Sequence, residues 1–353
     1  MRLFATFFAL LALAVPAFAQ QRQQPFGEEI EVNAVLLDVT VTDARGNQIL
    51  GLTPEDFVVK ENGVAQTIDS VDYFTNRQLL NEREENAPFK VERVHEDRYF
   101  IFFFDKPSDP GALSSQLALA REAARDFVRN QMKPTDFVAI AGHDMRLKIY
   151  SDFSNDRTQL ERAIDDAARY GRGLTKASGS GDAPSIVRTI NSKQMVNKTG
   201  TVYQALDLLA DSVRGIRGRK NVILFSPGIA DRDEAISNEM LLSRSRYLDP
   251  MLASLNAANV SVHAAQLQLE VATSPIFHQR LTEIAESTGG RYFQYNTTFQ
   301  NAVKSVEEAN AGYYLITYRS RHGRGERGFQ KVEVSVRNPE FRVTSRAGYQ
   351  YGG

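Results

Sequence analysis

The sequence contains no cysteine, which excludes a disulfide framework and any thiol chemistry. Its charges nearly balance at a formal net charge of −1, so no strong field recruits nucleic acid or acidic lipid. The five histidines lack the spacing of a zinc hydrolase. Neither a Gly-x-Ser-x-Gly elbow nor a phosphate-binding glycine loop with its lysine is present. Without a visible catalytic set, a binding protein is the leading hypothesis.

Only one apolar run in the sequence resembles a targeting segment, and it lies at the start. Arg2 supplies a positive charge, Leu3 to Val15 is almost wholly apolar, and Ala17-Phe18-Ala19 matches a small-x-small cleavage pattern. This run is too short for a membrane anchor, no lipobox cysteine follows it, and no later stretch approaches transmembrane length. We therefore expect cleavage after Ala19, and a secreted or periplasmic protein with no membrane span.

The rest of the chain is organised around a second apolar run, Tyr99 to Phe104, which ends in a single carboxylate at Asp105. An aromatic-rich run without polar alternation is typical of a strand buried on both faces. Ligands of open parallel sheets bind in the crevice outside the carboxyl ends of the strands. The sequence thus places Asp105 at a candidate binding edge.

After Asp105, short apolar runs alternate with helix-length amphipathic segments. This rhythm predicts parallel strands joined by right-handed crossovers, and therefore a doubly wound, Rossmann-like α/β domain. Within it we expect a long helix over residues 234–256. The segment over residues 175–198 is rich in Gly, Ser and Lys, which favours a loop.

The segments on either side of this domain have the alternation of β-strands, and Asn62-Gly63 between apolar runs predicts a hairpin. Each piece has too few strands to be stable alone, so we expect the two to combine in one sandwich-like β module. The predicted organisation is a signal peptide (1–19), a flexible leader (20–30), an N-terminal β unit (31–75), a charged linker (76–96), the α/β domain (97–311) and C-terminal strands that join the β unit (312–353).

Three segments resemble the VWFA-related domain proteins common in Acidobacteria. They are Val35-Leu-Leu-Asp-Val-Thr-Val-Thr-Asp-Ala-Arg-Gly46, Gly51-Leu-Thr-Pro-Glu-Asp-Phe57 and Arg346-Ala-Gly-Tyr349. The order of signal peptide, β unit, α/β domain and β tail is similar as well. The resemblance implies a von Willebrand factor type A domain in the α/β part, an exported protein-binding protein of unknown ligand, and no established enzymatic activity.

The resemblance also implies a metal-ion-dependent adhesion site, which holds Mg²⁺ or Ca²⁺ through hydroxyl and carboxylate oxygens. Its pattern is Asp-x-Ser-x-Ser after the first strand, then a Thr and an Asp on later loops. Asp105 matches the first position, whereas Pro107 and Pro227 stand where oxygen ligands belong. Thr199 and Thr201 flank the Thr position, and Asp231 follows Pro227. The predicted ligands of this degenerate site are Asp105, Ser108, Asp109 and Thr201.

Other interpretations of the same residues stay open at this point. Asp105 can cap the following helix, or Lys106 can neutralise it in place of a cation. A rival function is a metal-assisted hydrolase centred on Asp105, Asp109 and His143, and a third is a purely structural envelope protein. The leading hypothesis remains a non-catalytic, adhesion-type module with a protein partner.

Overall fold

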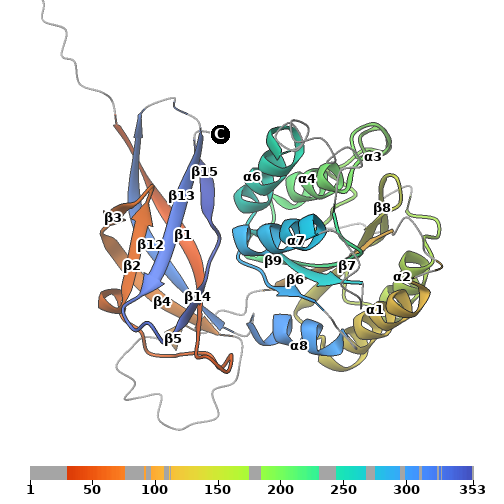
Figure 1. Cartoon of the computed structure of the whole chain (residues 1–353), viewed down its shortest axis with the longest axis horizontal. Coiled ribbons are helices and arrows are strands. Elements are labelled where there is room, and N and C mark those ends of the chain that lie inside the picture. Colours follow the sequence, from red (N-terminus) through yellow and green to blue (C-terminus); the bar gives the residue numbers. More distant parts are fainter. Residues whose placement is uncertain are drawn as a thin grey trace, which may run out of the picture.

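The computed structural model describes residues 30–75, 91–92, 97–106, 111, 113–174, 184–229, 244–267, 275–294, 299–309, 312–323, 326 and 328–351. The expected signal peptide and most of the leader fall outside these residues. So do three predicted site residues, Ser108, Asp109 and Asp231. Figure 1 shows a β module beside an α/β domain.

A six-stranded sheet forms the centre of the α/β domain, and its strand order is β11-β10-β9-β6-β7-β8. Five strands are parallel, and only the edge strand β8 runs antiparallel to its neighbour β7. The predicted fold class, a doubly wound and mostly parallel sheet, is confirmed. The strands are β6 (Arg98–Asp105), β7 (Asp136–His143), β8 (Leu147–Ser154), β9 (Lys220–Ser226), β10 (Val260–Gln266) and β11 (Tyr292–Phe293).

Helices cover both faces of this sheet, which is why every residue of β6 is buried. One face packs on α1 (Ser114–Asp126), the π-helical segment η3 (Phe127–Gln131), α2 (Arg157–Ala168) and α8 (Gln300–Ala309). The other packs on α3 (Ser192–Asn197), α4 (Val202–Val213), α6 (Asp249–Ala257) and α7 (Pro275–Ser287), and η4 (Arg244–Leu248) precedes α6. None of the described helices combines the length and apolar character needed to cross a bilayer.

Two helix predictions need correction. Helix α3 lies inside the segment that composition predicted to be a loop, because Asn191 and Gln194 form a capping box at its start. The helix expected over residues 234–256 is described only from Arg244 onward, where the chain is helical as predicted but begins with a π-helical segment, η4, that runs into α6.

The β module consists of two sheets around a shared apolar core. The five-stranded sheet has the order β14-β1-β12-β4-β5, with β1 (Ile30–Thr42), β4 (Ile68–Thr75), β5 (Val91–Glu92), β12 (Gly312–Gly323) and β14 (Arg342–Thr344). The four-stranded sheet has the order β15-β13-β2-β3, with β2 (Phe57–Glu61), β3 (Val64–Gln66), β13 (Gly328–Val336) and β15 (Gly348–Tyr351). A short 3₁₀ turn, η1 (Pro54–Asp56), precedes β2.

The two ends of the chain meet in this module, because β1 pairs antiparallel with β12 and Asp38 lies opposite Leu315. The predicted hairpin is also confirmed. Asn62 and Gly63 both have positive φ, 45° and 83°, as the tight turn between β2 and β3 requires. Sequence reasoning missed β5, which pairs in parallel with β4 inside a stretch predicted to be only a linker.

The β module contacts the α/β domain at the edge of the six-stranded sheet where the parallel strands begin. The Asn259 amide, just before β10, donates to Asp38 of β1 over 2.8 Å. The Arg346 guanidinium donates to the carbonyl oxygens of Asn256 and Leu36, over 3.1 and 2.7 Å. The carboxyl ends of the parallel strands therefore lie at the opposite edge of the sheet, away from this interface.

A buried lysine stands at the same interface. Lys220, the first residue of β9, donates from Nζ to the carbonyl oxygen of Ile216 over 2.8 Å. Burial lowers the pKa of Lys220 to about 8; the charge of Asp38 opposes this shift and that of Arg346 adds to it. The folded chain thus holds this proton less tightly than the unfolded chain does.

This difference predicts a pH dependence of stability. Between pH 8 and the ordinary lysine value of 10.5 the unfolded chain binds more protons at Lys220 than the folded chain does, so the contribution of Lys220 to the free energy of unfolding should rise with pH. The contribution of Lys220 over this window is about 3 kcal/mol. Urea unfolding across the window should show a smaller rise in Lys220→Met than in the wild type. Lys60→Met, a change of an exposed lysine on β2, should keep the wild-type rise, and equal rises in both variants would contradict the assignment.

Candidate functional site

Three polar residues end three neighbouring strands of the central sheet. Asp105 is the last residue of β6, His143 of β7 and Ser226 of β9. Because the strand order is β9-β6-β7, Asp105 lies between the other two. The sequence predicted the position of Asp105, and the sheet brings His143 and Ser226 to it.

The carboxylate of Asp105 is already engaged by its neighbours. The Ser226 hydroxyl donates to Oδ2 over 2.7 Å, and both groups are buried. Nδ1 of His143 lies 3.6 Å from Oδ1, longer than a hydrogen bond. On the other side of the ring, Nε2 lies 3.1 Å from the carbonyl oxygen of Thr199. A carbonyl oxygen only accepts, so this contact requires the ring proton on Nε2.

Both threonines near the predicted metal position have structural roles. The Thr199 hydroxyl is buried, accepts from the amide of Leu147 over 2.9 Å and donates to the carbonyl oxygen of Met195. Thr201 caps helix α4, where its hydroxyl accepts from the amide of Gln204 over 3.2 Å. Each hydroxyl therefore satisfies a backbone group beside a helix.

The metal site stays a prediction, because Ser108 and Asp109 lie outside the described residues. In the described part of the chain, Asp105 already accepts a hydrogen bond from Ser226, and Pro227 has no side-chain oxygen to offer. No cluster of three or more His, Asp or Glu side chains that could hold a metal occurs there. Ca²⁺ takes six to eight oxygen ligands, and Mg²⁺ takes nearly octahedral geometry. The oxygen atoms of the described residues alone do not form either set of ligands.

Lys106 does not neutralise Asp105, contrary to one interpretation of the sequence. Its Nζ donates to Asp144 over 2.8 Å, and Lys148 donates to the same carboxylate over 2.8 Å. Burial raises the pKa of Asp144, but the hydrogen bonds from the two lysines outweigh burial and hold this pKa below its ordinary value. This charged network lies beside Asp105 at the carboxyl edge of the sheet.

The structure contains one of the contacts that the rival hydrolase hypothesis needs, and it shows no activated nucleophile among the described residues. His143 and Asp105 do lie together, as that hypothesis requires. The nearby hydroxyl of Ser226, however, donates to the carboxylate and not to the imidazole, so histidine is not placed to activate it. The third member of the hypothesis, Asp109, lies outside the described residues.

Sequence reasoning missed Ser226 as the partner of Asp105. The available signal was positional: Ser226 is the first polar residue after the buried run of β9, as Asp105 is after that of β6. To predict that the ends of β6 and β9 lie side by side, one must know the order of the strands in the sheet, and a single sequence does not give this order.

The strand order and the helices on both faces of the sheet define a doubly wound, mostly parallel α/β domain, with a β module attached. No protein-family model and no curated protein matches the sequence. Solved structures do match, among them an aerotolerance-related membrane protein from Bacteroides fragilis, with 12% identity, 60% of this chain and 98% of that chain covered, and a TM-score of 0.39. The vWF domain of the type V pili tip protein Mfa5 from Porphyromonas gingivalis matches with 10% identity, 62% and 95% covered, and a TM-score of 0.39.

A mutant of the PilB minor pilin from Streptococcus sanguinis matches with 12% identity, 62% of this chain and 64% of that chain covered, and a TM-score of 0.38. At these identities and TM-scores the likeness is distant. The fold class therefore rests on the strand order itself, and function has to come from the site.

Proposed function

We propose that the protein is an exported, non-catalytic, adhesion-type module that binds a protein partner. In this proposal residues 97–311 form the binding domain, and residues 31–75 with 312–353 form the β module. The partner docks at the carboxyl edge of the central sheet, since the β module occupies the opposite edge. The predicted signal peptide supports export.

The exposed side chain of Met145 is the observation that carries this proposal. It lies in the turn between β7 and β8, next to the Lys106–Asp144 ion pair, and is 80% exposed. Its φ of 58° is uncommon for a residue other than glycine. Val196, at the end of α3 near the same edge, is 45% exposed. Contiguous apolar surface bordered by polar residues marks protein-contact sites, and we propose that Met145 and Val196 belong to one such surface.

A charge-insertion test follows from this surface. Met145→Glu should abolish capture of a partner from an envelope extract, because it introduces an uncompensated charge into the contact, while the melting temperature stays unchanged. Val64→Glu is the matched control, since Val64 is 65% exposed but lies on β3 of the β module. Capture that is absent in the wild type, or equal in both variants, would contradict the proposal.

We infer that binding needs no metal ion, because the Asp105 carboxylate is held by Ser226. Excess Mg²⁺ should therefore leave the melting temperature unchanged. Asp105→Ala should lower the free energy of unfolding by about 1–3 kcal/mol with or without Mg²⁺, since it leaves a buried hydroxyl without its acceptor. Ser226→Ala, alone and combined with Asp105→Ala, tests whether the two losses share one hydrogen bond. A saturable, Mg²⁺-dependent rise in the wild type that Asp105→Ala removes would establish the predicted metal site instead.

A further inference from the structure

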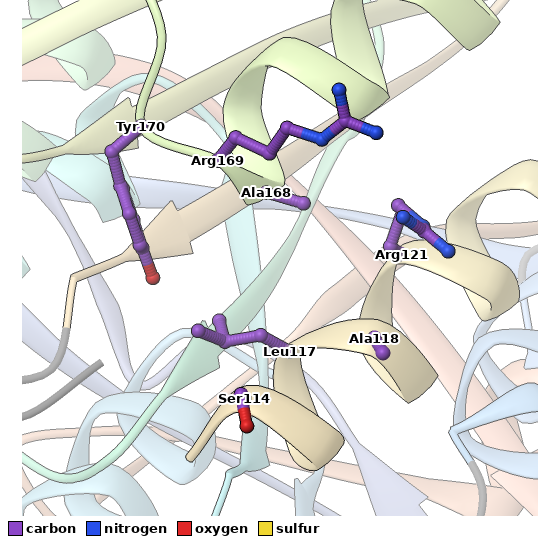
Figure 2. Close-up of a pocket in the computed structure, with 7 residues that line it drawn as sticks. All are labelled: Ser114, Leu117, Ala118, Arg121, Ala168, Arg169 and Tyr170. Atoms are coloured by element: carbon purple, nitrogen blue, oxygen red, sulfur yellow. The ribbon is translucent and has the colours of Figure 1, made fainter. Parts of the chain in front are cut away.

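A pocket of about 270 Å³ lies between the first half of α1 and the end of α2, as Figure 2 shows. Its apolar wall consists of Leu117, Ala118 and Ala168. Its polar groups come from Ser114, Arg121, Arg169 and Tyr170. None of Asp105, His143 and Ser226 lines it, so it is separate from the site described above.

Two guanidinium groups border one side of this pocket. Arg121 comes from α1 and Arg169 from the end of α2, and both lie across the pocket from Tyr170 (Figure 2). Glu122 and Asp165 pair with Arg121, at 3.0 and 3.9 Å. The exposed Arg169 forms no ion pair with any residue that the structure describes. Planar guanidinium groups are well suited to bind a carboxylate, through two parallel hydrogen bonds.

The other side of the pocket offers an unused donor. The Tyr170 hydroxyl oxygen is buried, and no described residue forms a hydrogen bond with it. In Figure 2 this hydroxyl points toward the first turn of α1, where Ser114 and Leu117 lie. Burial raises the pKa of Tyr170, and the charges of Asp105 and Asp144 raise it further. The phenol is therefore a neutral donor. Lys106 lies near its ring, with Nζ 5.5 Å from the centroid, but this ammonium is already paired with Asp144 at 2.8 Å.

We propose that the pocket binds a small carboxylic acid that carries a neutral oxygen at the far end of a short apolar chain. The carboxylate contacts Arg121 and Arg169, and the neutral oxygen accepts from Tyr170. The chain between them packs on the apolar wall. This small-molecule site goes beyond the proposed protein-binding function and does not depend on it.

The test is a titration of the whole chain with γ-hydroxybutyrate, butyrate and succinate at constant ionic strength, followed by NMR. γ-Hydroxybutyrate should bind saturably and about tenfold more tightly than butyrate or succinate, because only it offers Tyr170 a neutral acceptor. Tyr170→Phe should reduce its affinity to that of butyrate. Affinity in Tyr170→Phe equal to that of the wild type would overturn the assignment of the donor.

The arginines are tested by Arg121→Gln and Arg169→Gln, each of which should weaken all three acids about tenfold through loss of a charge-assisted hydrogen bond. Arg129→Gln is the control, because Arg129 follows α1, pairs with Glu161 at 2.6 Å and does not line the pocket. The proposal fails if no acid binds saturably to the wild type, or if Arg169→Gln binds as tightly as Arg129→Gln. Inorganic phosphate that binds more tightly than γ-hydroxybutyrate, with no dependence on Tyr170, would also overturn it.

Discussion

Asp136→Ala is expected to lower the free energy of unfolding by about 3–5 kcal/mol, because it leaves a buried guanidinium without its main partner. Asp136 and Arg98 begin the neighbouring strands β7 and β6 and lie opposite each other. Arg98 donates from Nε and Nη2 to the two carboxylate oxygens, over 2.7 Å in each case. The side chains are only 7% and 0% exposed, and Asp136 also accepts from the amide of Lys133 over 2.7 Å.

Urea unfolding followed by far-UV circular dichroism measures this loss, since the chain has no tryptophan to report fluorescence. The double variant Arg98→Met/Asp136→Leu should be more stable than Asp136→Ala, because it removes both charges and fills the space with apolar atoms. Asp69→Ala is the matched control: it breaks an exposed pair with Arg319, 3.1 Å apart, and should cost at most about 1 kcal/mol. Equal losses for Asp136→Ala and Asp69→Ala would contradict this account.

Glu61→Ala is expected to cost about 3–5 kcal/mol in the β module, because one buried carboxylate of β2 accepts four hydrogen bonds. Oε1 accepts from the hydroxyls of Tyr318 and Tyr349, over 2.8 and 2.7 Å. Oε2 accepts from Ser320 over 2.8 Å and from the Gln330 amide over 3.3 Å. Tyr318 lies on β12, in the other sheet, so Glu61 ties the two sheets of the sandwich together.

Thermal and urea unfolding of two substitutions test this role. Glu61→Gln should lower the free energy of unfolding less than Glu61→Ala does, because the glutamine amide keeps one acceptor oxygen. It should still be less stable than the wild type, because the amide NH₂ group then faces other hydrogen-bond donors. Glu333→Ala on the neighbouring strand β13 is the control, since Glu333 is exposed and pairs with the exposed Lys331 at 2.7 Å. If Glu61→Ala unfolds at the same urea concentration as Glu333→Ala, the carboxylate does not hold the sheets together.

Much of the fold could be predicted because its signals are local. The apolar run before Asp105 forms the fully buried strand β6, and one of the helix-length amphipathic segments after it forms α7. Predictions from composition were wrong where a few residues or a pairing strand determined the local structure. The capping box at Asn191 starts a helix in a segment rich in Gly, Ser and Lys, and the two-residue strand β5 exists only through its partner β4.

The candidate site could be predicted in position but not in its contacts. Asp105 stands at the expected edge of the sheet. Its position next to Asp105 in the sequence suggests Lys106 as the partner of this carboxylate, but Lys106 pairs with Asp144. The partner of Asp105 is Ser226, which is distant in the sequence. A carboxylate bonds to whatever donor the sheet order places beside it, and adjacent residues of a strand point to opposite faces.

The sequence by itself determined the properties that depend on consecutive residues: buried strands, amphipathic helices, the positive-φ turn at Asn62-Gly63, and the absence of disulfides. The tertiary structure alone decided which distant residues meet, such as Ser226 and Asp105 across 121 positions, or Glu61 and Tyr318 across 257. It also created the pocket between α1 and α2. The physical reason is that strand order and register are set by burying every apolar face at once, a condition on the whole chain that no local pattern contains.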